Sequence, residues 1–307
     1  MTTNINGTRM KVGLALGSGS ARGWAHIGVI NALAEQGIEP DIICGCSAGS
    51  LIAASYATEM LPQLEEWALS LTKKGTARFI KLNSSLSGVV NTNRLHSFLN
   101  DFVATDEQAI EKLTIPFGTV STELETGREI WFTRGPLLEA VWASISMPGL
   151  FPAIRNENRW LVDGGLVNPV PVTLCRALGA EIVIAVNLNS DIAGKQFAPK
   201  AETADDQQSV VGRLRETVRE YSSTLFTGGK GDDAPPGLLA AIASSLHILQ
   251  DRITRNRIAG DPPDILLTPR LMHIGLLEYF RAEEVITEGQ QCVERQLDEI
   301  RYTIGLD

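Results

Sequence analysis

The sequence predicts an α/β protein in which helices flank a central, mostly parallel sheet. Apolar runs of strand length lie at residues 11–16, 41–44 and 181–188. Between the first two, residues 24–36 place apolar side chains at helical spacing, and Gly37 supplies a natural C-terminal cap. A strand, a helix and a second strand in this order form parallel neighbours in one sheet.

The rest of the chain continues this alternation. Residues 61–113 have a mostly helical pattern, interrupted by a loop around 83–93. Further helices are expected at residues 50–60, 137–146, 238–253 and 282–302. Further strands are expected at residues 115–122, 129–133, 160–162 and 264–268.

A single domain is the simplest organisation for 307 residues with no internal repeat and no clean linker. Residues 10–190 carry the motifs, 190–237 form a polar, insertion-like segment, and 238–307 form a helical C-terminal part. Within the insertion, residues 209–226 have an amphipathic pattern. This pattern predicts either a lid or membrane-surface helix, or a helix packed on the domain.

The composition narrows the class of partner. A formal net charge of −9 argues against nucleic acid but leaves contact with a membrane surface open. The N-terminus is short and polar, and no run of about 18 apolar residues occurs. We therefore expect a cytoplasmic protein that could touch the inner membrane peripherally. The cysteines at 44, 46, 175 and 292 lack the paired spacing of a zinc site, so no metal is expected.

The segment Gly45-Cys46-Ser47-Ala48-Gly49 follows the second apolar run and precedes a helical pattern. Gly-x-Ser-x-Gly between a strand and a helix is typical of a nucleophile elbow, in which the serine hydroxyl is exposed on a strained turn. Gly45 and Gly49 let the backbone fold tightly beneath the serine. The motif predicts a serine hydrolase of esters or amides, with Ser47 as its nucleophile.

A loop of small residues, Gly17-Ser18-Gly19-Ser20-Ala21-Arg22-Gly23, follows the first strand. Backbone N–H groups in such a loop can bind an anion, either a dinucleotide phosphate or the oxyanion of acyl transfer. The dinucleotide fingerprint requires a glycine where Arg22 stands, and no acidic residue ends the second strand. Because the first two strands are expected to be neighbours, the loop should lie beside Ser47.

A serine nucleophile needs a proton acceptor. His247 and His273 follow Asp163 in the order of a Ser–Asp–His triad, but neither has a turn context that would present it at a sheet edge. His26 lies in a predicted helix, where a structural or supporting role is more common, and His96 carries no motif.

The remaining candidate base is Asp163, which ends a short strand and is followed by Gly164 and Gly165. The glycines would allow another loop to approach closely, although Asp-Gly-Gly is also typical of a plain turn. An ordinary aspartate has a pKa of about 3.9, so burial would have to raise its basicity.

As an ordered set, the 17–23 loop, the 45–49 elbow and Asp163-Gly164-Gly165 resemble patatin-like phospholipases. The blocks at residues 121–127, 144–152 and 168–171 are similar to the same family. The resemblance covers about residues 10–190. It is strongest to bacterial members related to the catalytic domain of neuropathy target esterase.

The resemblance implies a patatin-like three-layer α/β/α sandwich and a Ser47–Asp163 dyad without histidine. It also implies that the 17–23 loop, together with Ala48, forms the oxyanion and substrate-binding site, with no metal or organic cofactor. Ser18 and Ser20 stand where glycines are common in the family. Arg22 matches the family's basic residue, which would hold the loop or neutralise the oxyanion or a lipid phosphate; alone, it could also be a surface charge.

The expected function is a serine acyl hydrolase of lipid esters, of the phospholipase A or lysophospholipase type. The alternatives are a lipid acyltransferase and a regulatory protein of low turnover that keeps the fold. Candidates for an acyl-chain groove, each more typical of a core position, are Leu150, Phe151, Leu86 and Phe79.

Overall fold

The computed structural model describes residues 9–79, 92–148, 150–190 and 238–306. They contain an eight-stranded sheet in the order β5-β6-β3-β2-β1-β7-β8, with β4 paired to β3. The mutually parallel strands are β1 (Val12–Leu16), β2 (Ile42–Cys46), β3 (Phe117–Glu123), β7 (Ile182–Val186) and β8 (Ile265–Leu267). The antiparallel strands are β4 (Glu129–Phe132), β5 (Ile154–Asn156) and β6 (Arg159–Asp163).

The parallel strands are buried on both faces, which explains why their sequences read as continuous apolar runs. Alternate residues of β1 enter different cores. Leu14 and Leu16 belong to a large core under one helical layer, whereas Ala15 belongs to a smaller core with Val172 and Leu174. The sheet is therefore the middle of three layers, as the sequence predicts.

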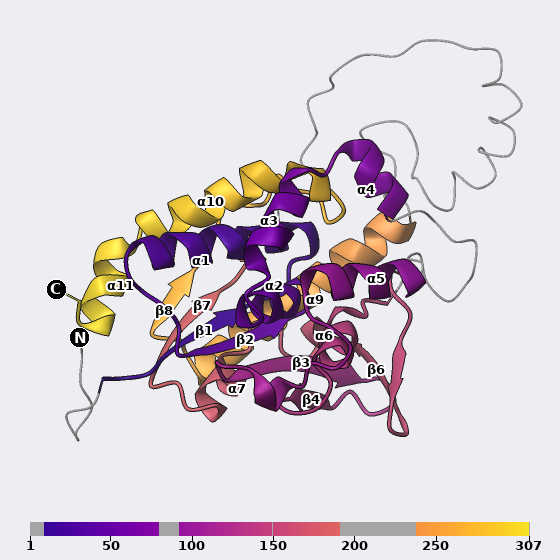
Figure 1. Cartoon of the computed structure of the whole chain (residues 1–307), viewed down its shortest axis with the longest axis horizontal. Helices are drawn as coiled ribbons and strands as arrows, with labels where there is room; N and C mark the ends of the chain where they lie inside the picture. Colours follow the sequence, from indigo (N-terminus) through magenta and orange to yellow (C-terminus); the bar gives the residue numbers. More distant parts are fainter. Residues whose placement is uncertain (1–8, 80–91, 149, 191–237, 307) are drawn as a thin grey trace, which may run out of the picture.

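Figure 1 shows α1 and α10 side by side over one face of the sheet, and α7 on the opposite side. The helices with the larger core are α1 (Ala25–Glu35), α2 (Ala48–Ala57), α3 (Leu61–Leu69), α5 (Thr92–Phe102), α6 (Leu137–Ile145), α10 (Ala282–Glu294) and α11 (Leu297–Ile304). The others are α4 (Lys73–Phe79), α7 (Val172–Ala177) and α9 (Leu238–Gly260).

The helices α1 and α10 touch backbone to backbone. A Cβ added to Gly28 would lie 1.9 Å from Ile286 O, and one added to Gly289 would lie 2.1 Å from Ala25 O. Neither position has room for a side chain, because the backbone of the facing helix occupies that space. This contact fixes the C-terminal part of the chain against the helix that follows the 17–23 loop.

Most predicted elements are present, and the differences have local causes. The predicted strand at 41–44 continues through Cys46, and a 3₁₀ turn, η1 (Ser20–Trp24), occupies most of the predicted loop. The predicted helix at 282–302 is two helices, α10 and α11, which break at residues 295–296. The short elements β5 and α7 were not predicted, because three to six residues carry little periodicity.

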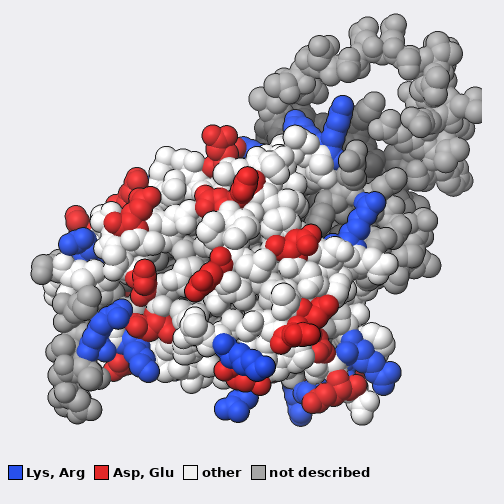
Figure 2. Space-filling view, viewed as in Figure 1, with Lys and Arg blue, Asp and Glu red and all other residues white. Residues whose placement is uncertain are grey.

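Some predictions lie outside the described residues. They concern the insertion-like segment at 190–237, its amphipathic stretch 209–226, and Leu86. No helix in the described part of the chain combines the length and the apolar character needed to span a bilayer. The face drawn in Figure 2 carries acidic and basic side chains interspersed, without one continuous basic surface.

Candidate active site

Two strands that run toward each other create the site. β2 is parallel to β3 and pairs Cys46 with Val120, whereas β6 is antiparallel to β3 and pairs Asp163 with Ser121. Because β4 occupies the other edge of β3, β2 and β6 share one edge, and their C-terminal ends meet at its middle. Ser47 directly follows the last residue of β2, and Asp163 is the last residue of β6. The topology therefore brings the two candidate catalytic residues together.

Ser47 sits at a strained elbow between β2 and α2. Its backbone has φ 54° and ψ −122°, a positive φ that is rare for residues other than glycine. Its N–H donates to Ser144 Oγ at 2.9 Å. A Cβ on Gly49 would lie 2.1 Å from Leu16 O, and one on Gly45 would lie 2.3 Å from Gly49 O. The glycines of the motif thus allow α2 to start directly above β1.

The Asp163 carboxylate accepts two hydrogen bonds. Ser47 Oγ donates to Oδ2 at 2.5 Å, and the Gly165 N–H donates to Oδ1 at 2.7 Å. The Asp163 main chain is fixed by bonds to Ser146 O and from Thr122 Oγ1. A Cβ on Gly164 would lie 2.2 Å from Val120 O, so the turn after β6 must pass close to β3. The carboxylate is oriented toward the serine by its surroundings.

Burial raises the pKa of Asp163 from 3.8 to about 6, against the opposing effect of the hydrogen bonds from Ser47 and Gly165. The side chain is 1% exposed. Asp163 is thus still ionised at neutral pH but is a stronger base than an ordinary aspartate. This is the change in basicity that a serine–aspartate pair requires.

The described histidine side chains have partners away from Ser47. His96 pairs with Asp106 at 2.9 Å, and His273 pairs with Glu284 at 2.8 Å. His26 is fully buried and its Nε2 lies 2.7 Å from Gly17 O, which can only accept, so Nε2 carries the proton. Burial lowers the pKa of His26 to about 4, and the ring is neutral. The side chain of His247, on α9, lies outside the description.

The 17–23 loop has two kinds of backbone N–H group. Those of Gly17, Ser18, Ala21 and Arg22 donate to Val186 O, Pro169 O, Leu276 O and Gly19 O. Within the described residues, the N–H groups of Gly19 and Ser20, and that of Ala48 at the start of α2, have no acceptor. The loop and α2 lie in contact, because a Cβ on Gly23 would be 2.5 Å from that of Ala48. Gly19, Ser20 and Ala48 are therefore the candidate oxyanion donors.

A distant segment, residues 274–279, holds this loop, and we call it the clamp segment. The Ala21 N–H and Ser20 Oγ both bond to Leu276 O. Ser20 Oγ also lies 2.8 Å from Tyr279 Oη, and Trp24 Nε1 donates to Tyr279 O. Ser20 has a positive φ of 52°, so these bonds fix a residue that glycine would satisfy more easily. Sequence reasoning missed the clamp segment, which carries no motif.

Arg22 joins the same contacts from inside the protein. Its side chain is 3% exposed, so the interpretation as a surface charge is wrong. The guanidinium donates to Ile274 O at 3.0 Å and to Asn189 Oδ1 at 3.2 Å. Burial lowers its pKa to about 10, with the charge of Glu278 opposing. These bonds fit the role of holding the loop.

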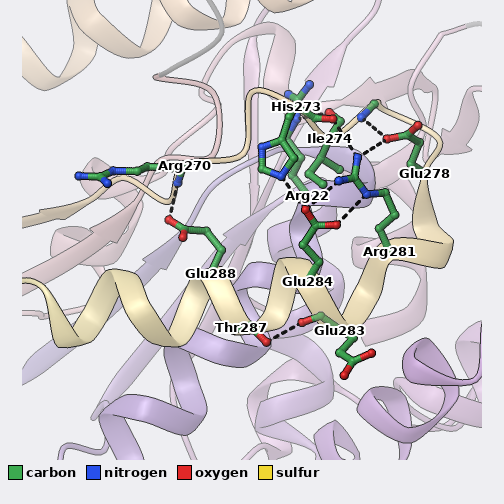
Figure 3. A network of polar contacts seen from close by, with 11 residues as sticks. Arg22, Arg270, His273, Ile274, Glu278, Arg281, Glu283, Glu284, Thr287 and Glu288 are labelled. Atoms are coloured by element: carbon green, nitrogen blue, oxygen red, sulfur yellow. Dashed lines mark hydrogen bonds and ion pairs between the residues drawn. The ribbon is translucent and has the colours of Figure 1, made fainter. Parts of the chain in front are cut away.

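Figure 3 shows how the clamp segment is itself anchored. Arg281 lies between Glu278 and Glu284, at 3.0 Å and 2.7 Å, and also donates to His273 O. The carboxylate of Glu278 accepts the Gly275 N–H. Charged pairs on α10 and η4 (Tyr279–Arg281) thereby fix the backbone that bonds the 17–23 loop.

Ser47 opens into an apolar cavity of about 80 Å³. Leu150 and Phe151 line it, and Phe151 also packs against the larger core, so the acyl-chain groove stays a prediction for both residues. The side chain of Phe79 lies outside the description. Sequence reasoning missed several lining residues, because apolar positions on amphipathic helices read as core: Trp67 from α3 and Leu95 and Phe98 from α5.

The cysteines of the described chain are all buried thiols. Burial raises the pKa of Cys46, and the nearby charge of Asp163 adds to the effect, so its thiol stays protonated. No group of three or more His, Cys, Asp or Glu within the described residues is placed to hold a metal ion.

A model of the patatin-like phospholipase family matches residues 14–176, the part that supplies both Ser47 and Asp163. The chain belongs to this family. An uncharacterized NTE family protein of Mycobacterium tuberculosis is 31% identical over 94% of the patatin-like chain and 91% of its own length. The crystal structure of VipD from Legionella pneumophila has a TM-score of 0.45 and 13% identity, and covers 97% of this chain and 69% of that one.

Two fungal relatives carry a functional name. The lysophospholipase NTE1 of Mycosarcoma maydis is 37% identical over 59% of the patatin-like chain, and the lysophospholipase nte1 of Aspergillus fumigatus is 28% identical over 94% of it. The chain spans only 10% and 18% of the length of these two proteins. The family and these relatives support a lipid hydrolase function.

Proposed function

We propose that the chain is a serine acyl hydrolase of lipid esters, of the phospholipase A or lysophospholipase type. Ser47 is the nucleophile and Asp163 is the general base. The observation that carries this proposal is the 2.5 Å hydrogen bond from Ser47 Oγ to Asp163 Oδ2 beside an apolar cavity.

The first half of the reaction forms an acyl-enzyme. Asp163 takes the Ser47 proton while Oγ attacks the ester carbonyl carbon. The N–H groups of Gly19, Ser20 and Ala48 are the candidate donors to the resulting oxyanion, and each such donor contributes roughly 10²–10³ in rate. When the carbon–oxygen bond of the ester breaks, Asp163 returns the proton to the leaving alkoxide oxygen.

The second half releases the fatty acid. Water gives a proton to Asp163, and its oxygen attacks the acyl carbon. Ser47 then leaves and recovers the proton, which restores both residues. The raised pKa of Asp163 suits its role as the base, because a carboxylate with a pKa near 6 accepts a proton more readily than one near 4. The protonated carboxyl group is still far more acidic than an alcohol, so it can return the proton to the leaving alkoxide.

The apolar cavity supports a lipid acyl group as the substrate portion next to Ser47. Its lining is dominated by aliphatic and aromatic side chains such as Leu51, Ile145 and Phe151. An acyl chain gains free energy on leaving water for such a surface. The names of the fungal relatives fit a lysophospholipid ester, and the name of the family fits a phospholipid ester.

The test uses p-nitrophenyl esters and defined lipids, with released products identified by mass spectrometry. Ser47→Ala and Asp163→Asn should each abolish turnover while retaining the fold, checked by circular dichroism. His96→Ala and His273→Ala are the matched controls and should keep wild-type rates. Activity that survives Ser47→Ala would overturn the proposal. An acylated lipid product without free fatty acid would identify an acyltransferase, and no product from any lipid would favour the low-turnover alternative.

A further inference from the structure

A second and larger cavity, of about 560 Å³, adjoins the one at Ser47. It lies between α3, residues 70–75 and α5. Three side chains, Trp67, Leu71 and Phe98, line both cavities. We call these three residues the shared wall.

We propose that the two cavities together hold a single acyl chain, which makes the protein selective for long-chain esters. The first cavity holds the carbons next to the ester, and the chain passes the shared wall so that its distal carbons lie in the second. This inference rests on the proposed function, because it places the ester carbonyl at Ser47.

The size of the first cavity supports this division. At about 80 Å³, the space next to Ser47 is small beside the second cavity. Each additional methylene that leaves water for an apolar surface should tighten binding about threefold to fourfold. That gain can continue along a long chain only if the chain continues past the shared wall.

The shared wall is held by aromatic packing. The Trp67 ring centroid lies 4.7 Å from that of Phe98 and 5.3 Å from that of Phe102. A third aromatic contact joins Trp67 to Trp24, at 6.1 Å. Rings fixed on several sides give the shared wall an apolar surface of defined shape.

The rim of the second cavity is polar, and its polar side chains are Ser70, Thr72, Asn93, Arg94, Ser97 and Asp101. Arg94 and Asp101 could suggest a zwitterionic head group as the occupant. However, such a head group would have to reach this rim through the apolar shared wall, where a phosphate would lose its hydration. An acyl chain pays no such cost, and its end can lie on Phe98 and Phe102 beneath the rim.

The experiment compares Leu71→Trp with Leu69→Trp. Leu71 belongs to the shared wall, whereas Leu69 is 49% exposed and lines neither cavity. Values of kcat/KM are measured for p-nitrophenyl esters of 4, 8, 12 and 16 carbons. In wild type and Leu69→Trp we expect kcat/KM to rise with chain length. Leu71→Trp should lower it at least tenfold for the two longest esters and less than twofold for the shortest.

Equal chain-length profiles in the two variants would overturn the inference, provided that hydrolysis depends on Ser47. Hydrolysis independent of Ser47 would instead refute the proposed function, so the two failures are distinguishable. A second measurement covers the case in which Leu71→Trp does not fold. In Ser47→Ala protein, 12-bromododecanoic acid should quench tryptophan fluorescence, and Trp67→Phe should remove most of the quenching. Quenching unchanged by Trp67→Phe, or its reversal by glycerophosphocholine, would contradict the acyl-chain assignment.

Discussion

The hydroxyl oxygens of Ser20 and Tyr279 lie 2.8 Å apart and join the 17–23 loop to a part of the chain 259 residues away. Ser20 Oγ also lies 2.8 Å from Leu276 O, which can only accept. Ser20 therefore donates to Leu276, and Tyr279 donates to Ser20. Two bonds thus hold Ser20 at its positive φ, next to the Gly19 N–H that would face the oxyanion.

Tyr279→Phe removes the bond to Ser20 and keeps the ring that lines the cavity. We expect a loss of about 0.5–1.5 kcal/mol in unfolding free energy, the usual net value of one hydrogen bond. If the bond positions the 17–23 loop for binding the oxyanion, kcat should fall severalfold while the KM of a short ester stays unchanged. Chemical denaturation and steady-state kinetics measure both effects. A lower stability with unchanged kcat would show that the bond supports the fold alone.

The rate of the free enzyme should depend on the ionisation of Asp163. The carboxylate accepts the serine proton only when it is ionised, and burial raises its pKa to about 6. Below that pH, kcat/KM should fall about tenfold per unit, and above pH 7 it should reach a plateau. His96→Ala and His273→Ala should keep the same midpoint. A midpoint near 4 would contradict the effect of burial.

Asp163→Asn should make the protein more stable at neutral pH. Between pH 3.8 and about 6, the native state holds a proton that the unfolded chain has released, so native stability falls as pH rises through this window. Asparagine removes the free-energy cost of ionising a buried carboxyl group. We therefore expect the unfolding free energy to rise by roughly 1–3 kcal/mol above pH 7, and this gain should vanish below pH 4. Denaturant unfolding at several pH values measures it, with the exposed Asp101→Asn as a control that should follow wild type. A gain that does not change with pH would argue against this cause.

Thr76 offers a test of the cavity wall. Its side chain is buried in the lining, and its hydroxyl has no hydrogen-bond partner among the described residues. Thr76→Val should raise stability by up to about 1 kcal/mol and lower the KM of saturated esters, since an unpaired buried hydroxyl is costly. Thr72→Val is the contrasting variant, because Thr72 Oγ1 accepts a hydrogen bond from the Gly75 N–H at 3.0 Å. Loss of this bond should lower the unfolding free energy by about 1 kcal/mol. Thermal melting and ester kinetics compare the two, and an equal loss in both would refute the assignment.

The sequence predicts the parts of the site that lie on short motifs. The Gly-x-Ser-x-Gly pattern locates the elbow at Ser47, and the strand order places the 17–23 loop beside it. The end-to-end meeting of β2 and β6 has no local signal, because it depends on how three distant segments share the edges of β3. This is why the sequence spacing alone cannot distinguish a catalytic Asp163 from an aspartate in a plain turn.

Long-range contacts explain the remaining gaps. Leu276 and Tyr279 look like ordinary loop residues, and only their position against Ser20 gives them a role. Trp67 and Phe98 read as core residues because a cavity wall and a core share the same apolar pattern. The burial of Arg22 likewise depends on Ile274 and Asn189, which are far away in sequence.

The central strand β1 has β2 on one side and β7 on the other. A fragment that ended at residue 176, where the family match stops, would lack β7 and leave β1 as an open edge. Open edges of apolar strands pair with other chains, so such a fragment should aggregate instead of folding. The stretch that matches the patatin-like family model is thus expected to be too short to fold by itself. A transfer of this site to another protein would have to include β7, β8 and α10.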